Sequence, residues 1–143
     1  MEFVEIDWNS NLYSLEIELR ARLLRAPLGL TFSSKELEAE SAELHFAMVD
    51  QEQVRACAVI VPLSSDLAKL RQMAVHENYQ RQGLGSSLIR QIEPALQHRG
   101  FQKIELNARE EAVNFYKRLG YQTVGDPFME VGIGHWKMYR QLG

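Results

Sequence analysis

The chain has 143 residues, of which 45% are hydrophobic and 24% are charged, and its formal net charge is −3. This length and composition predict one soluble globular domain with a core of its own. The negative charge gives no reason to expect nucleic acid or an anionic membrane as a partner. A single cysteine, Cys57, excludes an intrachain disulfide, which suits a reducing cytoplasm.

The first thirty residues predict a strand and a helix. Residues 2–6 alternate apolar and charged side chains, as a short strand does. Asn9 or Ser10 can cap the helix that follows, and this helix should end near residues 27–29, Pro-Leu-Gly. We expect two i,i+4 ion pairs on the outer face of the helix, Glu16/Arg20 and Glu18/Arg22. The N-terminus lacks the features of a secretory signal, and no run of about 18 apolar residues is present to span a membrane.

An antiparallel block of strands should come next. Residues 31–41 are polar and predict a loop with a helical turn. Leu44–Val49 and Val54–Val61 predict two strands, and the short polar link between them predicts a hairpin. Asp66–Val75 predicts the third strand of this block.

The second half of the chain alternates helices and strands. A helix should run from Gly83 to Arg99, although Pro94 should kink it or end it early. The remaining predictions are strand 102–107, helix 110–119, strand 121–125 and strand 135–142. Antiparallel strands followed by this tail predict an α/β fold, a single domain with a mixed sheet and helices on both faces.

The stretch Gln-Arg-Gln-Gly-Leu-Gly-Ser-Ser, at residues 80–87, lies between a predicted strand and a predicted helix. A helix start offers unpaired N–H groups and the positive end of its dipole to an anion, and Gly83 and Gly85 allow close approach. The run lacks the Gly-Lys-Ser/Thr of a P-loop, and Leu88 stands where the dinucleotide motif needs its third glycine. The loop is therefore a candidate pyrophosphate site of another kind.

A second motif lies downstream. Asn107 ends a predicted strand, and residues 114–121 read Asn-Phe-Tyr-Lys-Arg-Leu-Gly-Tyr. The two motifs, in this order and at this spacing, resemble the signatures of the GNAT acetyltransferase superfamily. The resemblance covers residues 43–142. The chain also resembles a subgroup of small, mostly uncharacterised bacterial members of this superfamily. The shared runs are Leu-Arg-Gln-Met-Ala-Val, Leu-Asn-Ala-Arg and the Gly-Ile-Gly-His of residues 132–135.

The resemblance implies a sheet that splays between the strands Leu67–Val75 and Lys103–Asn107, with the pantetheine arm of acetyl-coenzyme A in the splay. It implies acetyl-coenzyme A as co-substrate. The spacings of His45, His76 and His98 suggest no metal site. Met73, Ala74 and Val75 would pair with the pantetheine through their backbone, and Asn107 would bond it through its side chain. The pyrophosphate would lie on the loop residues Arg81, Gln82, Gly83, Leu84, Gly85 and Ser86. Arg81 and Arg109 are each either phosphate contacts or solvated charges.

Tyr116 is the residue that the resemblance assigns to protonation of the leaving thiol, and it would also line the cofactor site. Which residue acts as the base that activates the amine is left open. Many family members carry Glu on the strand before the glycine loop, but Arg71 and Gln72 stand on this one, and neither acts as a base at neutral pH. His135 is the alternative base, because histidine titrates near neutral pH. It follows Gly134, where the subgroup usually has proline.

The leading hypothesis is an N-acetyltransferase that uses direct attack by a primary amine of a small molecule or peptide in a ternary complex. A non-catalytic acyl-coenzyme A sensor on the same fold and a nucleotide-phosphate binder are the alternatives. We expect a cytoplasmic protein with no nucleic-acid or membrane partner. A homodimer is possible. The acceptor is unidentified. An acidic rim of Glu36, Glu38, Glu40 and Glu43 would favour a cationic amine, unless these residues only form a solvated face.

Overall fold

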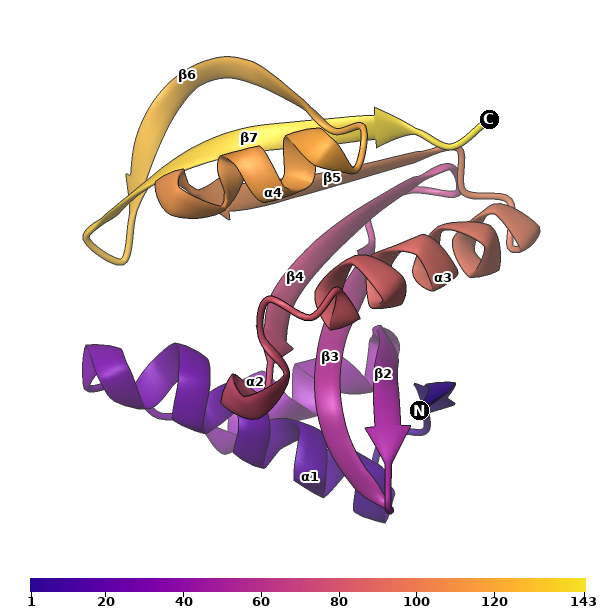
Figure 1. Ribbon diagram of the computed structural model, residues 1–143, viewed down its shortest axis with the longest axis vertical. Helices are drawn as coiled ribbons and strands as arrows, with labels where there is room; N and C mark the ends of the chain where they lie inside the picture. The colour runs from indigo at the N-terminus through magenta and orange to yellow at the C-terminus, as the bar shows by residue number, and fades with distance from the viewer.

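Seven strands form one mixed sheet in the order β1-β2-β3-β4-β5-β7-β6, in a computed structural model that describes residues 1–143 (Figure 1). The strands are β1 Glu2–Ile6, β2 Leu44–Asp50, β3 Gln53–Pro62, β4 Leu67–Val75, β5 Lys103–Arg109, β6 Gln122–Glu130 and β7 Ile133–Gln141. Only β4 and β5 pair in parallel, whereas all other neighbours are antiparallel. The single parallel pair joins an N-terminal block of four strands to a C-terminal block of three.

Helices cover both faces of the sheet. The helices are α1 Asn11–Arg20, α2 Ser34–Ala39, α3 Leu84–His98 and α4 Val113–Arg118. One apolar cluster, which includes Leu88, Ile92 and Tyr116, packs α3 and α4 against the sheet. A smaller cluster, which includes Leu19 and Cys57, packs α1 against the other face. The predicted mixed α/β sheet with helices on both faces is confirmed.

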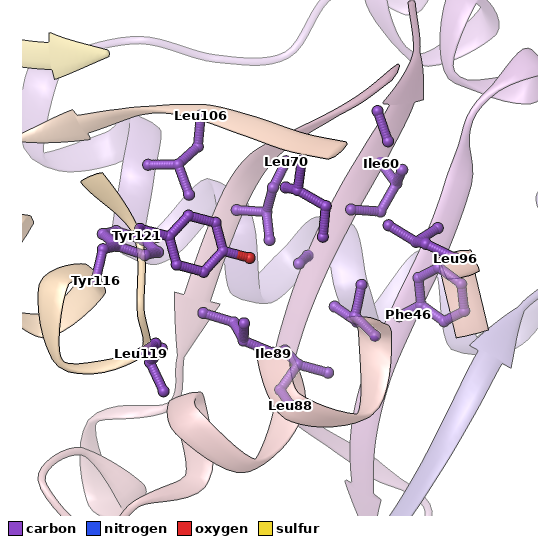
Figure 2. Packing of buried hydrophobic residues seen from close by; sticks show 14 of the residues in the cluster. Phe46, Ile60, Leu70, Leu88, Ile89, Leu96, Leu106, Tyr116, Leu119 and Tyr121 are labelled. Atoms are coloured by element: carbon purple, nitrogen blue, oxygen red, sulfur yellow. The ribbon is translucent and has the colours of Figure 1, made fainter. Parts of the chain in front are cut away.

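The main core lies between α3, α4 and the sheet. Figure 2 shows Leu88, Ile89 and Leu96 of α3 directed at the strands that carry Phe46, Ile60 and other core residues. Leu70 of β4 and Leu106 of β5 lie in the same cluster, and both are almost fully buried. The core therefore holds β4 and β5 together at the level of these two leucines.

The N-terminal elements follow the sequence prediction closely. The Ser10 hydroxyl accepts a hydrogen bond from the Tyr13 amide and caps α1. The helical path continues past Arg20 through a π-helical segment, Ala21–Arg25, and a 3₁₀ turn, Ala26–Leu28. It ends at Gly29, which has φ +70°. A left-handed glycine is a frequent helix terminator.

Some strand and helix bounds differ from the prediction. α3 has nearly the predicted bounds and continues through Pro94 to His98, so of the two expected effects of Pro94 the early end does not occur. β6 extends to Glu130 rather than residue 125, because a bulge lies between Val124 and Phe128 and Gly125 takes φ +74°. β6 is an edge strand, where a proline such as Pro127 costs no ladder hydrogen bond. β7 begins at Ile133, two residues before the predicted start.

The Glu16/Arg20 pair was expected on the outside of α1, and this prediction is wrong. Arg20 and Glu16 are both 0% exposed and face the sheet, with Arg20 Nη1 2.5 Å from Glu16 Oε2. Arg20 also donates to both carboxylate oxygens of Glu40, at 2.8 and 2.5 Å. The second expected pair, Glu18/Arg22, does not form, because Arg22 binds Glu77 instead. Helical spacing predicts which residues are neighbours but not which face they occupy.

His45 completes this buried network. Its Nδ1 lies 3.1 Å from Glu16 Oε2, and its Nε2 lies 3.0 Å from the Glu40 carbonyl oxygen. Burial by itself would lower the pKa of His45, but the hydrogen bond and charge of Glu16 outweigh it and raise the pKa. Two acceptors on one imidazole favour the form that carries both protons.

The carboxylates of Glu16 and Glu40 and the His45 ring come within 4.8 Å of one another, as metal ligands do. The Arg20 guanidinium already lies between the two carboxylates and supplies the positive charge. Burial would raise the pKa of Glu40, but the hydrogen bond from Arg20 outweighs it and lowers the pKa. We therefore assign the cluster to an ion network that fixes α1 on the sheet.

The raised pKa of His45 predicts a pH-dependent stability. The protonated ring is stabilised in the folded state, so its contribution is present below about pH 6.5 and is lost as the pH rises through the folded-state pKa. His45→Gln should therefore lower the free energy of unfolding more at about pH 6 than at about pH 9, as measured by urea denaturation. His98→Gln, at an exposed position, is the control. An equal loss at both pH values would show that His45 is neutral in the folded protein.

Candidate active site

β4 and β5 pair over four residues and then separate. The paired residues run from Leu67↔Lys103 to Leu70↔Leu106. Beyond that level β4 continues along β3 as far as Val75, and β5 continues along β7 as far as Arg109. Figure 1 shows the two strands diverging from a common end. The β5-facing edge of β4 past Leu70 therefore has no strand partner.

A bulge in β4 marks the point of separation. Arg71 pairs with Val59 and Ala74 pairs with Cys57, so Gln72 and Met73 together oppose one residue of β3. Gln72 has φ +52°, which is uncommon for a residue other than glycine. Bulges bend a strand and re-aim its side chains. The bulge turns β4 away from β5 and opens the sheet.

A cavity of about 530 Å³ lies in the opening. Its walls come from the end of the first helical segment, from β4 around the bulge, from the end of β5, from α4 and from the β6–β7 turn. Five candidate residues from the sequence analysis meet there: Met73, Asn107, Arg109, Tyr116 and His135. Ala74 and Val75 do not line the cavity, because Ala74 is buried towards α1 and Val75 packs on the main core.

The glycine loop lies at the start of α3. Gly83 has φ +80° and precedes the helix, and no side chain caps the helix N-terminus. Arg81 takes φ +63° and is exposed together with Gln82, whereas Leu84 is buried. Gln80 supports the loop, because its Nε2 donates to the Val75 carbonyl oxygen at 2.9 Å. An uncapped helix start with open amides is the arrangement that a phosphate requires.

Gly83 and Gly85 serve different purposes. A Cβ on Gly83 would meet nothing within 4 Å, so this position needs glycine for its left-handed backbone. A Cβ on Gly85 would lie 3.2 Å from Met73 Cε and 3.4 Å from Val75 Cγ2. Gly85 therefore lets α3 pack closely against the end of β4. Ser86 follows in the first turn of α3 and is half-buried.

Tyr116 lies on α4 at the inner wall of the cavity. Its ring packs edge-on against Phe115 and Tyr121, at centroid distances of 5.0 and 5.8 Å. The side chain is 7% exposed, and burial raises its pKa to about 12. A phenol with this pKa is protonated at neutral pH and can donate a proton or a hydrogen bond.

His135 lies on β7 across the cavity mouth and contacts Glu130. Its Nδ1 lies 2.8 Å from the Ile133 carbonyl oxygen, which can only accept, so Nδ1 carries a proton. Its Nε2 then lies 3.4 Å from Glu130 Oε2, and Phe128 stacks on the ring. Both residues line the cavity, and a carboxylate lies beside Nε2. A Cβ on Gly134 would lie 3.4 Å from Glu110 Oε2, so the turn before His135 has little spare room.

The sequence analysis did not place four charged residues at the cavity, the first of which is Arg25. Lys69 and Arg71 line it from β4, and Glu130 lines it from the end of β6. The alternation of charged and apolar residues in Leu-Ala-Lys-Leu-Arg could have placed Lys69 and Arg71 on one face of the strand. Nothing in the sequence around Glu130 indicated that β6 extends that far. Arg109, which was a candidate phosphate contact, lines the cavity beside His135, its register partner on β7.

The glutamates of residues 36–43 do not form a free acidic rim. Glu36 binds Arg25 at 2.9 Å, and the guanidinium lowers the pKa of that carboxyl. Glu43 binds Arg71 at 3.0 Å. Glu40 is buried and forms an ion pair with Arg20. Only Glu38 of the four makes no ion pair. The charges of this segment are thus largely neutralised by arginines of the same region.

Known structures with this fold include acetyltransferases. An aminoglycoside 6'-N-acetyltransferase complexed with coenzyme A superposes with a TM-score of 0.84 at 18% identity, covering 99% of this chain and 97% of the other. ElaA of Escherichia coli superposes with a TM-score of 0.81 at 19% identity, covering 98% and 99%. At these identities the similarity establishes the fold. No helix of this protein combines the length and apolar character of a membrane span.

Sequence similarity establishes the family. Residues 31–142 match the acetyltransferase (GNAT) domain family. YitI of Bacillus subtilis, an uncharacterised N-acetyltransferase, is 31% identical over 132 residues, which cover 87% of this chain and 89% of YitI. The predicted family is confirmed. The chain belongs to the GNAT acetyltransferase family and is an acetyl-coenzyme A-dependent acyltransferase.

Proposed function

We propose that the protein transfers the acetyl group of acetyl-coenzyme A to a primary amine by direct attack in a ternary complex. The observation that carries the proposal is the cavity at the β4–β5 separation, because it brings Tyr116 and the His135–Glu130 pair to one space. Acetyl-coenzyme A supplies a thioester, which an amine attacks without metal assistance. The open edge of β4 and the uncapped start of α3 fit its pantetheine arm and its pyrophosphate.

Direct attack is favoured because the chain offers no suitable nucleophile for an acyl-enzyme. Cys57 is its only cysteine and is 0% exposed on β3, in the cluster under α1. Burial raises the pKa of the Cys57 thiol, so a thiolate does not form at neutral pH. The amine must therefore reach the thioester itself.

Two residues have roles in proton movement. His135 Nε2, with Glu130 beside it, accepts the proton of the incoming ammonium directly or through water. Tyr116 donates to the departing sulfur, since its raised pKa keeps the hydroxyl protonated. The amides of Met73 and its neighbours on the unpaired edge of β4 can polarise the thioester carbonyl. Asn107 lies on the facing strand and can bond the pantetheine.

An acceptor screen tests the proposal as a whole. The protein is incubated with acetyl-coenzyme A and separate amines, and release of the coenzyme A thiol is followed together with the mass of the product. The proposal requires stoichiometric N-acetylation of at least one amine. Tight acetyl-coenzyme A binding with no transfer to any amine would favour the non-catalytic sensor.

Tyr116→Phe should lower kcat more than it changes the affinity for acetyl-coenzyme A. General acid catalysis contributes roughly 10²–10⁴-fold, and a thiolate leaves readily, so we expect a loss of about 10²-fold. Steady-state kinetics gives kcat, and calorimetry gives the dissociation constant. Tyr139→Phe removes a hydroxyl that bonds Gln122 outside the cavity and is the control. Turnover at the wild-type level in Tyr116→Phe would leave this residue a packing role only.

His135→Gln should change the pH profile of kcat/KM. If the imidazole takes the proton, kcat/KM of the wild type rises with pH as the base loses its own proton. The variant, measured on the same acceptor, should lack this rise, while the amine's own titration appears in both proteins. Circular dichroism and coenzyme A binding check that the variant folds. Superimposable profiles would exclude His135 as the base.

A further inference from the structure

The cavity carries an uneven distribution of charge. Four cationic side chains line it, and Glu130 is its one acidic side chain. The chain as a whole has a net charge of −3, so the positive wall is a local feature. The cationic residues are Arg25, Lys69, Arg71 and Arg109.

Two of these cations have carboxylate partners and two do not. Arg25 binds Glu36, and Arg71 binds Glu43 and, at 3.3 Å, Glu40. No carboxylate lies within ion-pair distance of Lys69 or Arg109. Glu105, the register neighbour of Lys69 on β5, binds Lys137 at 3.4 Å. Lys69 and Arg109 therefore bring uncompensated positive charge to the cavity wall.

The two free cations lie on the strands that form the opening. Lys69 and Arg71 are two residues apart on β4 before the bulge, so they share one face of the sheet. Arg109 ends β5 and is the register neighbour of His135. The acidic Glu130 is beside the same histidine. A molecule bound in the cavity would thus meet the carboxylate of Glu130 next to His135, and cationic side chains elsewhere on the wall.

We propose that the acetyl acceptor is an amine that also carries a carboxylate or phosphate group, bound by Lys69 and Arg109. This inference rests on the proposed function. The amine lies near His135 and Glu130, where its proton is removed, and the anion lies against the cationic wall. A polycationic acceptor would place further positive charge against Lys69 and Arg109, which is unfavourable in a partly enclosed cavity. The proposed pyrophosphate site, at the start of α3, is separate from this cavity.

Matched acceptors test the inference. One pair is an amino acid and its methyl ester, a second is an aminoalkyl phosphate and the corresponding amino alcohol, and a polyamine represents the cationic class. We expect the anionic member of at least one pair to have a kcat/KM at least about tenfold higher than its neutral partner, because charge-assisted hydrogen bonds discriminate by about this much. The pair that shows the effect distinguishes carboxylate from phosphate. The preference should weaken as salt is added.

Variants then assign the preference to residues. Lys69→Gln and Arg109→Gln should each reduce the ratio of kcat/KM between the anionic and neutral acceptors about tenfold. Lys117→Gln, at an exposed position on α4 outside the cavity, should leave the ratio as in the wild type. A parallel rise in the KM for acetyl-coenzyme A would place the cations in donor binding and overturn the inference.

The acceptor panel also separates this inference from the proposed function. Transfer to neutral amines or to the polyamine, with no advantage for the anionic acceptors, would overturn the proposed preference for anionic acceptors. The proposed N-acetyltransferase activity would be unaffected by that result. Absence of transfer to every amine, with acetyl-coenzyme A still bound, would overturn both.

Discussion

The proposed active site depends on a parallel strand pair that stops after four residues. Leu70 and Leu106 hold β4 and β5 together on the main core, and the bulge at Gln72 and Met73 then turns β4 towards β3. Arg20 contributes from the opposite face, since its Nε donates to Gln72 Oε1 at 3.4 Å. If β4 and β5 were paired along their whole length, neither the free edge of β4 nor the cavity beside it would exist. In the proposed function, cofactor and acceptor binding both depend on this separation of the two strands.

The buried ion network connects helix α1 to this separation. Arg20 is held by two carboxylates and reaches the bulge residue, and Glu40 also contacts Arg71 at the cavity wall. Breaking such a network leaves a buried charge without a partner, which typically costs several kcal/mol, about 3–5. The network therefore positions the wall of the cavity as well as the helix. The positive charge left without a carboxylate partner at the cavity wall is that of Lys69 and Arg109.

Local patterns in the sequence predicted the elements and the family, but not the charges that meet in space. The Ser10 cap, the hairpin and the glycine loop are local features, so their residues alone predict them. The face of α1 that carries Glu16 and Arg20 could not be predicted, because the further partners of these charges are distant in sequence: His45 on β2 for Glu16, and Glu40 for Arg20. The end of β6 at Glu130 also depends on pairing with β7 across a bulge. The sequence analysis therefore could not place Glu130 beside His135, where the structure has it.

A crystal structure of the protein with bound acetyl-coenzyme A tests the central claim most directly. The account predicts a pantetheine arm paired with the backbone of Met73–Val75 on the free edge of β4, the pyrophosphate on the amides of residues 83–86, and the sulfur next to the Tyr116 hydroxyl. The acetyl group would then face the cavity that His135 and Glu130 border. A cofactor bound elsewhere, or β4 and β5 paired along their whole length in the complex, would contradict it.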